Sequence, residues 1–232
     1  MKGDIIYRLY YILKQRAIVF FDKVIKRRGN KFVLMLHQID NTGGEYSISK
    51  TNFKKMIEGK KFLTLKSFSF FEEKSYLLTF DDVDESVYDL AIGVLEEKDI
   101  PYYLFLCVEY INKEGYLNEK QIKRLLKNKN CHIGSHLLHH KLARKMQKEE
   151  LVKELSDSKR YLEETFGIQV DSVAFPYGSM YACGDDEFNL AKKYYKYIFT
   201  TVPTPCRNEH FERNVMPRIN INNKTFTRRE IQ

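Results

Sequence analysis

From residue 32 to residue 221 the sequence alternates between short apolar runs and longer runs with helical spacing. Short apolar runs are typical of buried strands, and helices between them make consecutive strands parallel. The predicted strands cover 32–36, 76–80, 103–107, 132–135, 172–175, 197–200 and 215–221. The predicted helices cover 86–98, 118–127, 147–166 and 185–194. We therefore expect an α/β fold, in which seven strands favour an incomplete (β/α)7 barrel over an open sheet.

Basic charge is concentrated at the start of the chain. Residues 1–30 hold eight basic and two acidic residues, which gives them +6 of the whole chain's +8. A nucleic-acid enzyme normally spreads basic residues over its binding face, so we expect no nucleic-acid partner. With 232 residues the chain is long enough for one substantial core. We predict two parts, a basic amphipathic helix over 1–30 and one folded domain over 31–232.

Apolar residues at steps of three and four predict one helix over residues 4–27, ended by Arg27-Arg28-Gly29-Asn30. The pattern fits a helix on an anionic membrane surface and equally a helix packed on the domain. The longest apolar stretch near the start, Ala17–Phe21, is too short for a secretory signal or a membrane span. We expect a cytoplasmic protein with four reduced, buried cysteines, and with residues 1–30 as a peripheral contact to the inner membrane face.

Two adjacent carboxylates, Asp81 and Asp82, directly follow the apolar strand 76–80. The carboxyl end of a strand is where ligands bind in α/β folds. Neighbouring carboxylates repel each other, so a cation that holds one of them explains why both are present. A polar turn that caps helix 86–98 is the simpler explanation, but Asp84 serves that purpose as well.

Four of the six histidines fall between residues 132 and 140. His136 and His140 are four residues apart, so on one helical turn both imidazoles would face the same point. This density favours a metal site over isolated polar histidines. His139 and His132 remain alternative ligands. A third segment, Pro176-Tyr177-Gly178, stops an apolar strand and by itself predicts only a turn.

Together these segments resemble the polysaccharide deacetylase family, whose domain occurs in chitin and peptidoglycan deacetylases. The family has a Thr-Phe-Asp-Asp motif, a His-x-x-x-His motif about 50 residues later and then a Pro-Tyr motif. Here Thr79-Phe80-Asp81-Asp82, His136 with His140, and Pro176-Tyr177 come in that order. The resemblance extends over about residues 32–221 and implies a distorted, incomplete β/α barrel.

The first strand resembles the branch of the family that acts on poly-N-acetylglucosamine. In that branch a histidine on an early strand replaces the histidine of a C-terminal Leu-x-His motif. His37, in Val33–Ile39, is the matching residue, and no Leu-x-His occurs near the end of the chain. Without the resemblance, His37 would be interpreted as a locally hydrogen-bonded histidine at a strand end.

Several family residues are replaced. Val83 stands for the usual Gly, Leu137 for a Ser or Thr, and Ala174 for an Arg that orients the catalytic Asp, while the Trp motif is absent. Arg218 is the candidate to replace that arginine from a neighbouring strand. None of the replacements removes a metal ligand.

The resemblance implies metal-assisted removal of N-acetyl groups from a sugar. Asp82, His136 and His140 would hold a divalent ion, for which two imidazoles and one carboxylate favour Zn²⁺. Asp81 would act as the base, kept ionised and oriented by Arg218.

His37 would protonate the departing amine, and the backbone N–H of Tyr177 would stabilise the oxyanion. Pro176 and Tyr177 would contact the substrate, which is an N-acetylated sugar, an oligosaccharide or a lipid-linked glycan of cell-surface polysaccharide synthesis.

Three alternatives remain open at this point. The same site could hydrolyse an O-acetyl ester, or the chain could be an inactive module that binds a glycan or a partner. Two histidines and a carboxylate also describe a non-haem iron oxygenase, against which the adjacent aspartates and the strand–helix alternation argue.

Overall fold

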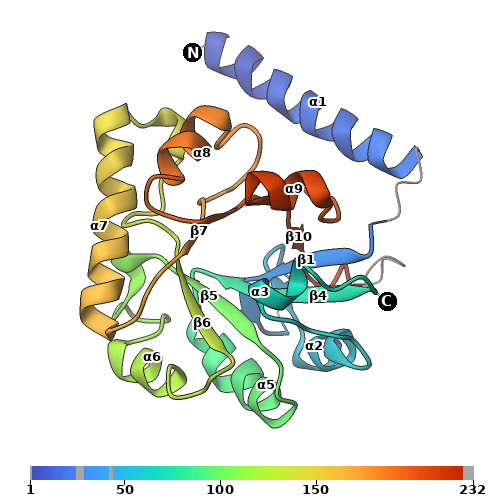
Figure 1. The fold of residues 1–232 in the computed structure, drawn as a ribbon, viewed down its shortest axis with the longest axis vertical. Helices are drawn as coiled ribbons and strands as arrows, with labels where there is room; N and C mark the ends of the chain where they lie inside the picture. The colour runs from blue at the N-terminus through green and yellow to red at the C-terminus, as the bar shows by residue number, and fades with distance from the viewer. Residues whose placement is uncertain (1, 25–28, 42–43, 227–232) are drawn as a thin grey trace.

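An eight-stranded parallel sheet curls into an open barrel at the centre of the molecule (Figure 1). The computed structural model describes residues 2–24, 29–41 and 44–226. The strand order is β10-β1-β4-β5-β6-β7-β8-β9. The strands are β1 Lys31–Leu36, β4 Ser75–Asp81, β5 Tyr102–Leu106, β6 Cys131–Ser135, β7 Ser172–Ala174, β8 Tyr197–Phe199, β9 Val215–Met216 and β10 Ile219–Asn220, and a separate pair is formed by β2 Gln38–Ile39 and β3 Ser47–Ile48. The predicted α/β fold with a distorted, incomplete barrel is confirmed.

The last predicted strand is two strands, which brings the sheet to eight instead of seven. β9 pairs with β8, whereas β10 pairs with β1 at the opposite edge of the sheet. Pro217 lies between them and has no backbone N–H to donate to a ladder. The chain therefore crosses from one edge to the other at Pro217-Arg218, and it spans the gap of the open barrel without pairing the two edges.

Alternate residues of each strand face the barrel interior, as the period of two of a strand requires. On β4, Leu77 belongs to the inner apolar cluster, and Leu78 and Phe80 belong to the outer cluster under the helices. Asp81 is two residues from Thr79 and four from Leu77, so it has the inward direction at the carboxyl end of the strand.

Most helices cover the outer side of the sheet (Figure 1). They are α2 Lys50–Ile57, α4 Glu85–Val87, α5 Gly93–Glu97, α6 Glu119–Leu125, α7 Lys148–Phe166 and α8 Asp185–Ala191. The short helices α3 Leu65–Phe68 and α9 Asn208–Arg213 instead pack against the inner cluster, through Leu65, Phe68 and Phe211. The four predicted helices are present, but the first is divided into α4, a π-helical turn over Tyr88–Ile92, and α5. α7 ends at Gly167, whose φ of 66° is the left-handed conformation that glycine adopts readily.

The amino-terminal helix α1, Lys2–Val24, lies across the outside of the domain next to α8 and α9 (Figure 1). Residues 25–28, which include the predicted basic helix end at Arg27-Arg28, lie outside the described residues. The division of the chain at residue 30 therefore stays a prediction. Among the helices that the structure describes, none combines the length and the apolar character needed to cross a bilayer. All four cysteines are free and buried, as expected.

Gly134 on β6 gives a test of the barrel interior. A Cβ at this position would lie 2.4 Å from Cε1 of Phe105, which is fully buried. We expect Gly134→Ala to lower the free energy of unfolding by about 1–3 kcal/mol, because a packed ring must move. Gly93→Ala is the matched control: nothing lies within 4 Å of its Cβ position, and alanine favours a helix by about 0.5–1 kcal/mol. Urea unfolding of both variants measures the difference, and equal stabilities would contradict this packing.

Candidate active site

A buried ion pair lies at the carboxyl end of the barrel. Arg218 lies between β9 and β10. It donates to both carboxylate oxygens of Asp81, from Nη1 at 2.6 Å and from Nη2 at 2.7 Å. Its Nε donates to the carbonyl of Thr200 and its Nη1 also to Oγ1 of Thr79, at 3.0 and 3.3 Å. Both side chains are almost fully buried. The two-fold hydrogen bond fixes the orientation of Asp81 as well as its charge.

The charge of Arg218 decides the protonation state of Asp81. Burial by itself favours the neutral acid, but Arg218 and the nearby histidines outweigh it and hold the pKa of Asp81 at about 2. Asp81 is therefore ionised at neutral pH. The contact between Arg218 and Asp81 is the one that the sequence analysis expected.

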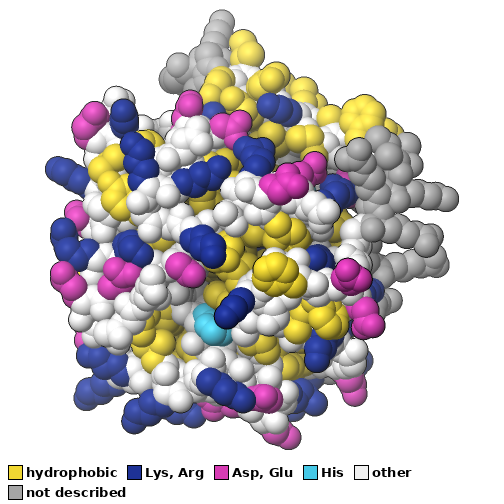
Figure 2. Space-filling view, in the orientation of Figure 1, with side chains coloured by type: hydrophobic (Ala, Val, Ile, Leu, Met, Phe, Trp, Pro, Cys, Tyr) yellow, Lys and Arg dark blue, Asp and Glu magenta, His cyan; other side chains and the backbone are white. Residues whose placement is uncertain are grey.

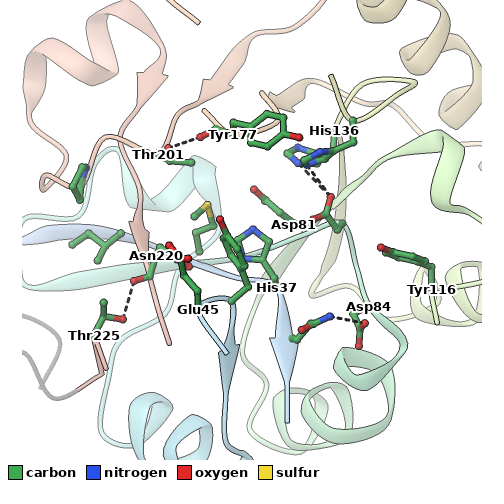
Figure 3. A pocket seen from close by; sticks show the side chains of 17 residues that line it. His37, Glu45, Asp81, Asp84, Tyr116, His136, Tyr177, Thr201, Asn220 and Thr225 are labelled. Atoms are coloured by element: carbon green, nitrogen blue, oxygen red, sulfur yellow. Dashed lines mark hydrogen bonds and ion pairs between the residues drawn. The ribbon is translucent and has the colours of Figure 1, made fainter. Parts of the chain in front are cut away.

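Asp82 and two histidines converge beside this pair (Figure 3). Oδ1 of Asp82 lies 3.6 Å from Nε2 of His136 and 3.5 Å from Nε2 of His140. One ligand atom from each of the three residues lies within 4.8 Å of the other two. Burial raises the pKa of Asp82 and lowers the pKa of His136 and of His140. Burial therefore opposes the charge on each group unless an added charge compensates.

The chemistry of these atoms fits a cation. Nδ1 of His136 lies 2.7 Å from the carbonyl oxygen of Ala174, which only accepts, so Nδ1 carries the proton. Nε2 of His136 then presents a lone pair toward Asp82, whose buried Oδ1 has no hydrogen-bond partner. Two acceptors that face each other in a buried place repel unless a positive ion lies between them. Two imidazoles and a carboxylate are a donor set that suits Zn²⁺.

The segment that carries both histidines is a loop, which corrects the expectation of a helical turn. β6 ends at Ser135, and Leu137 adopts a left-handed φ of 67°. Glu154, a buried residue of α7, holds this loop: its Oε2 accepts from the N–H groups of Leu138 and His139 at 3.0 and 2.9 Å. The loop turns His136 and His140 toward one point because its backbone is fixed, not because of helical spacing.

His139 lies at Glu154 and not in the group around Asp82. Its Nδ1 is 2.6 Å from Oε1 of Glu154. His132 lies at the other end of β6, where its ring stacks on Tyr103 at 4.6 Å. Of the alternatives left open by the sequence, the structure therefore brings His136 and His140 to Asp82.

A pocket of about 520 Å³ opens above these residues (Figure 3). His37 follows β1 and lines the pocket, with a buried Nδ1 that has no hydrogen-bond partner. Burial lowers the pKa of His37. Tyr177 forms part of the wall, and its carbonyl accepts from Oγ1 of Thr201 at 2.7 Å. Pro176 is buried in the turn below Tyr177 and is not among the lining residues.

The pocket also contains residues that the sequence analysis did not identify, namely Met35, Gln38, Glu45, Tyr46, Asp84, Tyr116, Thr201, Pro203, Ile219, Asn220 and Thr225. Asn220 could have been predicted as a pocket residue. It is two residues from Arg218 on a predicted strand, so the two side chains are expected on the same side of the sheet. Glu154 could also have been noticed, because it is a charged residue on the apolar, buried side of α7, beside Leu151 and Leu155. Tyr46 and Tyr116 come from irregular segments, where no periodicity indicates a direction.

The backbone around the pocket is strained. Asp82, Val83, Leu137 and Tyr177 all adopt left-handed conformations, with φ between 57° and 67°. This region costs a non-glycine residue roughly 1–2 kcal/mol, and it is most unusual for a β-branched residue such as Val83. At Val83 the left-handed φ is one that glycine, the residue expected there from the family motif, adopts without this cost.

The chain belongs to the polysaccharide deacetylase family, whose profile matches residues 70–196. The matched range includes Asp81, Asp82, His136 and His140. The assignment expected from the sequence is confirmed.

Among curated proteins, the chain is similar to a poly-beta-1,6-N-acetyl-D-glucosamine N-deacetylase of Staphylococcus aureus. The two are 29% identical, and the match covers 78% of this chain and 70% of the relative. The protein of that name from Staphylococcus epidermidis is 26% identical.

Among solved structures, a candidate polysaccharide deacetylase of Bacillus anthracis aligns with a TM-score of 0.71 at 26% identity, over 82% of this chain. This chain covers 64% of that protein's length. IcaB from Ammonifex degensii aligns with a TM-score of 0.73 over 86% of this chain and 94% of its own, at 20% identity, which supports the fold alone.

We predict that Glu154→Gln weakens Zn²⁺ binding by about 10–100-fold. The substitution keeps the shape of the side chain but places an amide NH₂ group where two backbone N–H groups and His139 now meet a carboxylate. Glu150→Gln on the same helix is the control, because that side chain is exposed and pairs only with Lys141. Competition with a chromophoric chelator measures both affinities, and equal values in the two variants would show that Glu154 does not hold the loop.

We also predict that Arg218→Met lowers the free energy of unfolding by about 3–5 kcal/mol, because it leaves the charge of Asp81 buried without a partner. Arg160→Met breaks an exposed pair with Asp157, which we expect to change stability by less than about 1 kcal/mol. Urea unfolding compares the two. A small effect of Arg218→Met would mean that another group compensates Asp81.

Proposed function

We propose that this chain is a metal-dependent hydrolase that removes N-acetyl groups from an N-acetylglucosamine-containing glycan of the cell surface. The observation that carries the proposal is the convergence of Asp82, His136 and His140 next to the oriented carboxylate of Asp81 in one pocket. Membership of the polysaccharide deacetylase family supports the reaction class. The names of the curated relatives support the sugar.

Asp82, His136 and His140 are the residues that would hold the ion, which we propose is Zn²⁺. When bound, such an ion supplies Lewis acidity, which polarises an amide carbonyl and makes water easier to deprotonate. The Nδ1–H of His136 and the carbonyl of Ala174 keep that ring in the tautomer whose Nε2 is free to coordinate.

Asp81 is the proposed general base. It is ionised because of Arg218, and the guanidinium occupies both of its oxygens from one side, which leaves their remaining lone pairs to accept a proton from the attacking water. The backbone N–H of Tyr177 is the proposed donor to the oxyanion that develops on the acetyl carbonyl.

His37 is the proposed acid. Its buried Nδ1 has no hydrogen-bond partner among the residues that the structure describes, and burial lowers its pKa, so the ring is mainly neutral at neutral pH. Only its protonated form would act as the acid, and the lowered pKa makes that form give its proton to the departing amine more readily. The proton goes to the amine nitrogen as the carbon–nitrogen bond breaks, so that acetate and the free amine are the products.

The pocket favours a sugar substrate. The rings of Tyr46, Tyr116 and Tyr177 line its wall, and Glu45 and Asn220 add polar groups that suit sugar hydroxyls. An inactive module is less favoured, because Arg218 supplies the contact that the loss of the family arginine at Ala174 had put in question. Hydrolysis of an O-acetyl ester uses the same groups, and lipid-linked glycans remain within the proposed substrate class.

We predict that His136→Ala and Asp82→Ala each abolish tight Zn²⁺ binding. Asp81→Asn should keep the metal but lower activity by about 10²–10⁴-fold, since it removes only the base. Circular dichroism checks that each variant is folded, and metal analysis after dialysis separates the two roles. Equal metal loss in all three would show that the two aspartates are assigned wrongly.

Acetate release from N-acetylglucosamine oligosaccharides tests the reaction itself, with O-acetylated sugars in parallel. Activity with the first and none with the second supports the proposal. Release from the esters alone would identify an esterase. Binding of oligosaccharide without release by the Zn²⁺-loaded protein would identify a non-catalytic module.

A further inference from the structure

The helix α1 contacts the domain mainly through polar groups. The hydroxyls of Tyr7 and Tyr11 each accept from Nη1 of Arg144 at 3.3 Å. Oε1 of Gln15 accepts from the backbone N–H of Met180 at 3.0 Å. Near the other end of the helix, Asp22 pairs with Arg207. These contact residues follow one another at steps of four, four and seven residues, so they define one face of the helix, which is turned to the domain.

The opposite face of α1 is apolar and exposed. Its large side chains are each more than half exposed: Ile5 65%, Ile6 70%, Leu9 54%, Tyr10 56%, Leu13 55%, Phe20 63% and Phe21 58%. In Figure 2 hydrophobic side chains gather at the top of the molecule, over the place where α1 lies in Figure 1. A helix on a soluble protein normally has the reverse arrangement, with its apolar stripe on the core.

The same helix carries basic residues at the borders of the apolar face and, at Arg16, within it, because Arg16 is four residues from Phe20 and seven from Leu9. Arg8, Lys14 and Arg16 are exposed, and residues 1–30 have a net charge of +6 in the sequence. An apolar face bordered by Lys and Arg is the arrangement of helices that lie in the head-group layer of anionic membranes. The charge and the apolar surface therefore indicate one kind of environment.

We propose that α1 is an interfacial helix whose exposed apolar face inserts into the head-group layer of an anionic lipid bilayer. A second copy of this chain is a poorer occupant, because two segments of charge +6 would repel each other where their apolar faces meet. Anionic lipids offer both an apolar layer and opposite charge. The polar contacts with Arg144, Met180 and Arg207 would then hold the domain on the membrane through the other side of the helix.

This placement has a consequence for the pocket, which rests on the proposed function. Met180 contacts α1 and follows Tyr177, on the pocket wall, by three residues. The middle of α1, at Gln15, is thus joined to the rim of the pocket through a single short loop. Binding at a membrane would hold that rim near the lipid surface, where membrane-attached glycans are found.

The cytoplasmic location expected from the sequence stays a prediction.

The test uses the full chain and vesicles of phosphatidylcholine mixed with phosphatidylglycerol, compared with phosphatidylcholine alone, in a flotation assay. We expect binding to the anionic vesicles that weakens with added salt, since salt screens the attraction. Phe20→Glu should weaken binding by at least about tenfold, because it removes a ring from the inserted face and adds a negative charge. Phe70→Glu is the matched control, an 82% exposed phenylalanine on the loop after α3.

Three results would overturn the proposal. The first is no binding of the full chain to anionic vesicles at low salt. The second is equal loss of binding in Phe20→Glu and Phe70→Glu. The third is a concentration-dependent dimer that Phe20→Glu dissociates in the absence of vesicle binding, which would make a second copy the occupant. None of these readouts depends on deacetylation, so a failure here and a failure of the proposed activity are separate results.

Discussion

The contact between Asp81 and Arg218 is the constraint on which the rest of the site depends. A carboxylate inside the barrel is tolerated only with a paired cation, and that cation comes from the segment that joins the two edges of the sheet. The segment that spans the two sheet edges therefore also supplies the charge that keeps Asp81 ionised. Asp82 directly follows β4, and it lies with His136 and His140 at the carboxyl end of the barrel. Glu154 of α7 holds the loop of the two histidines from the outer side of the sheet.

Much of the fold follows from local pattern. Short apolar runs predicted the positions of most strands. The apolar stripe over residues 147–166, with Gly167 after it, predicted α7. Helices of eight residues or fewer repeat an apolar stripe only once or twice, which makes their signal weak: α6 and α8 were predicted, whereas α2, α3 and α9 were not. Pro217 was visible in the sequence, but whether its flanks pair with one neighbour or with two opposite edges is decided by tertiary contacts. The grouping of Asp82, His136 and His140 was anticipated from motif order, although the geometry that produces it is a loop.

The case of α1 shows a different limit of sequence reasoning. Periodicity identifies the two faces of a helix but does not say which one faces the protein. Here the domain presents Arg144, Arg207 and the backbone N–H of Met180, which bind polar groups of α1, so the polar face is turned to the domain and the apolar face to the solvent. The direction of a helix on its domain depends on the partner surface, which is assembled from residues more than a hundred positions away.

The left-handed residues have a consequence for how the molecule divides its tasks. Asp82, Val83, Leu137 and Tyr177 all lie in loops at the carboxyl end of the barrel, whereas the strands below them have regular parallel hydrogen bonding. Val83 and Leu137 are fully buried, so apolar packing compensates for their unfavourable backbone. The hydrogen-bonded strands thus provide the stability of the domain, whereas the loops around the pocket contain the unfavourable backbone conformations. Substitutions in the pocket loops can therefore change which sugar binds, while the strands of the barrel and their stability are retained.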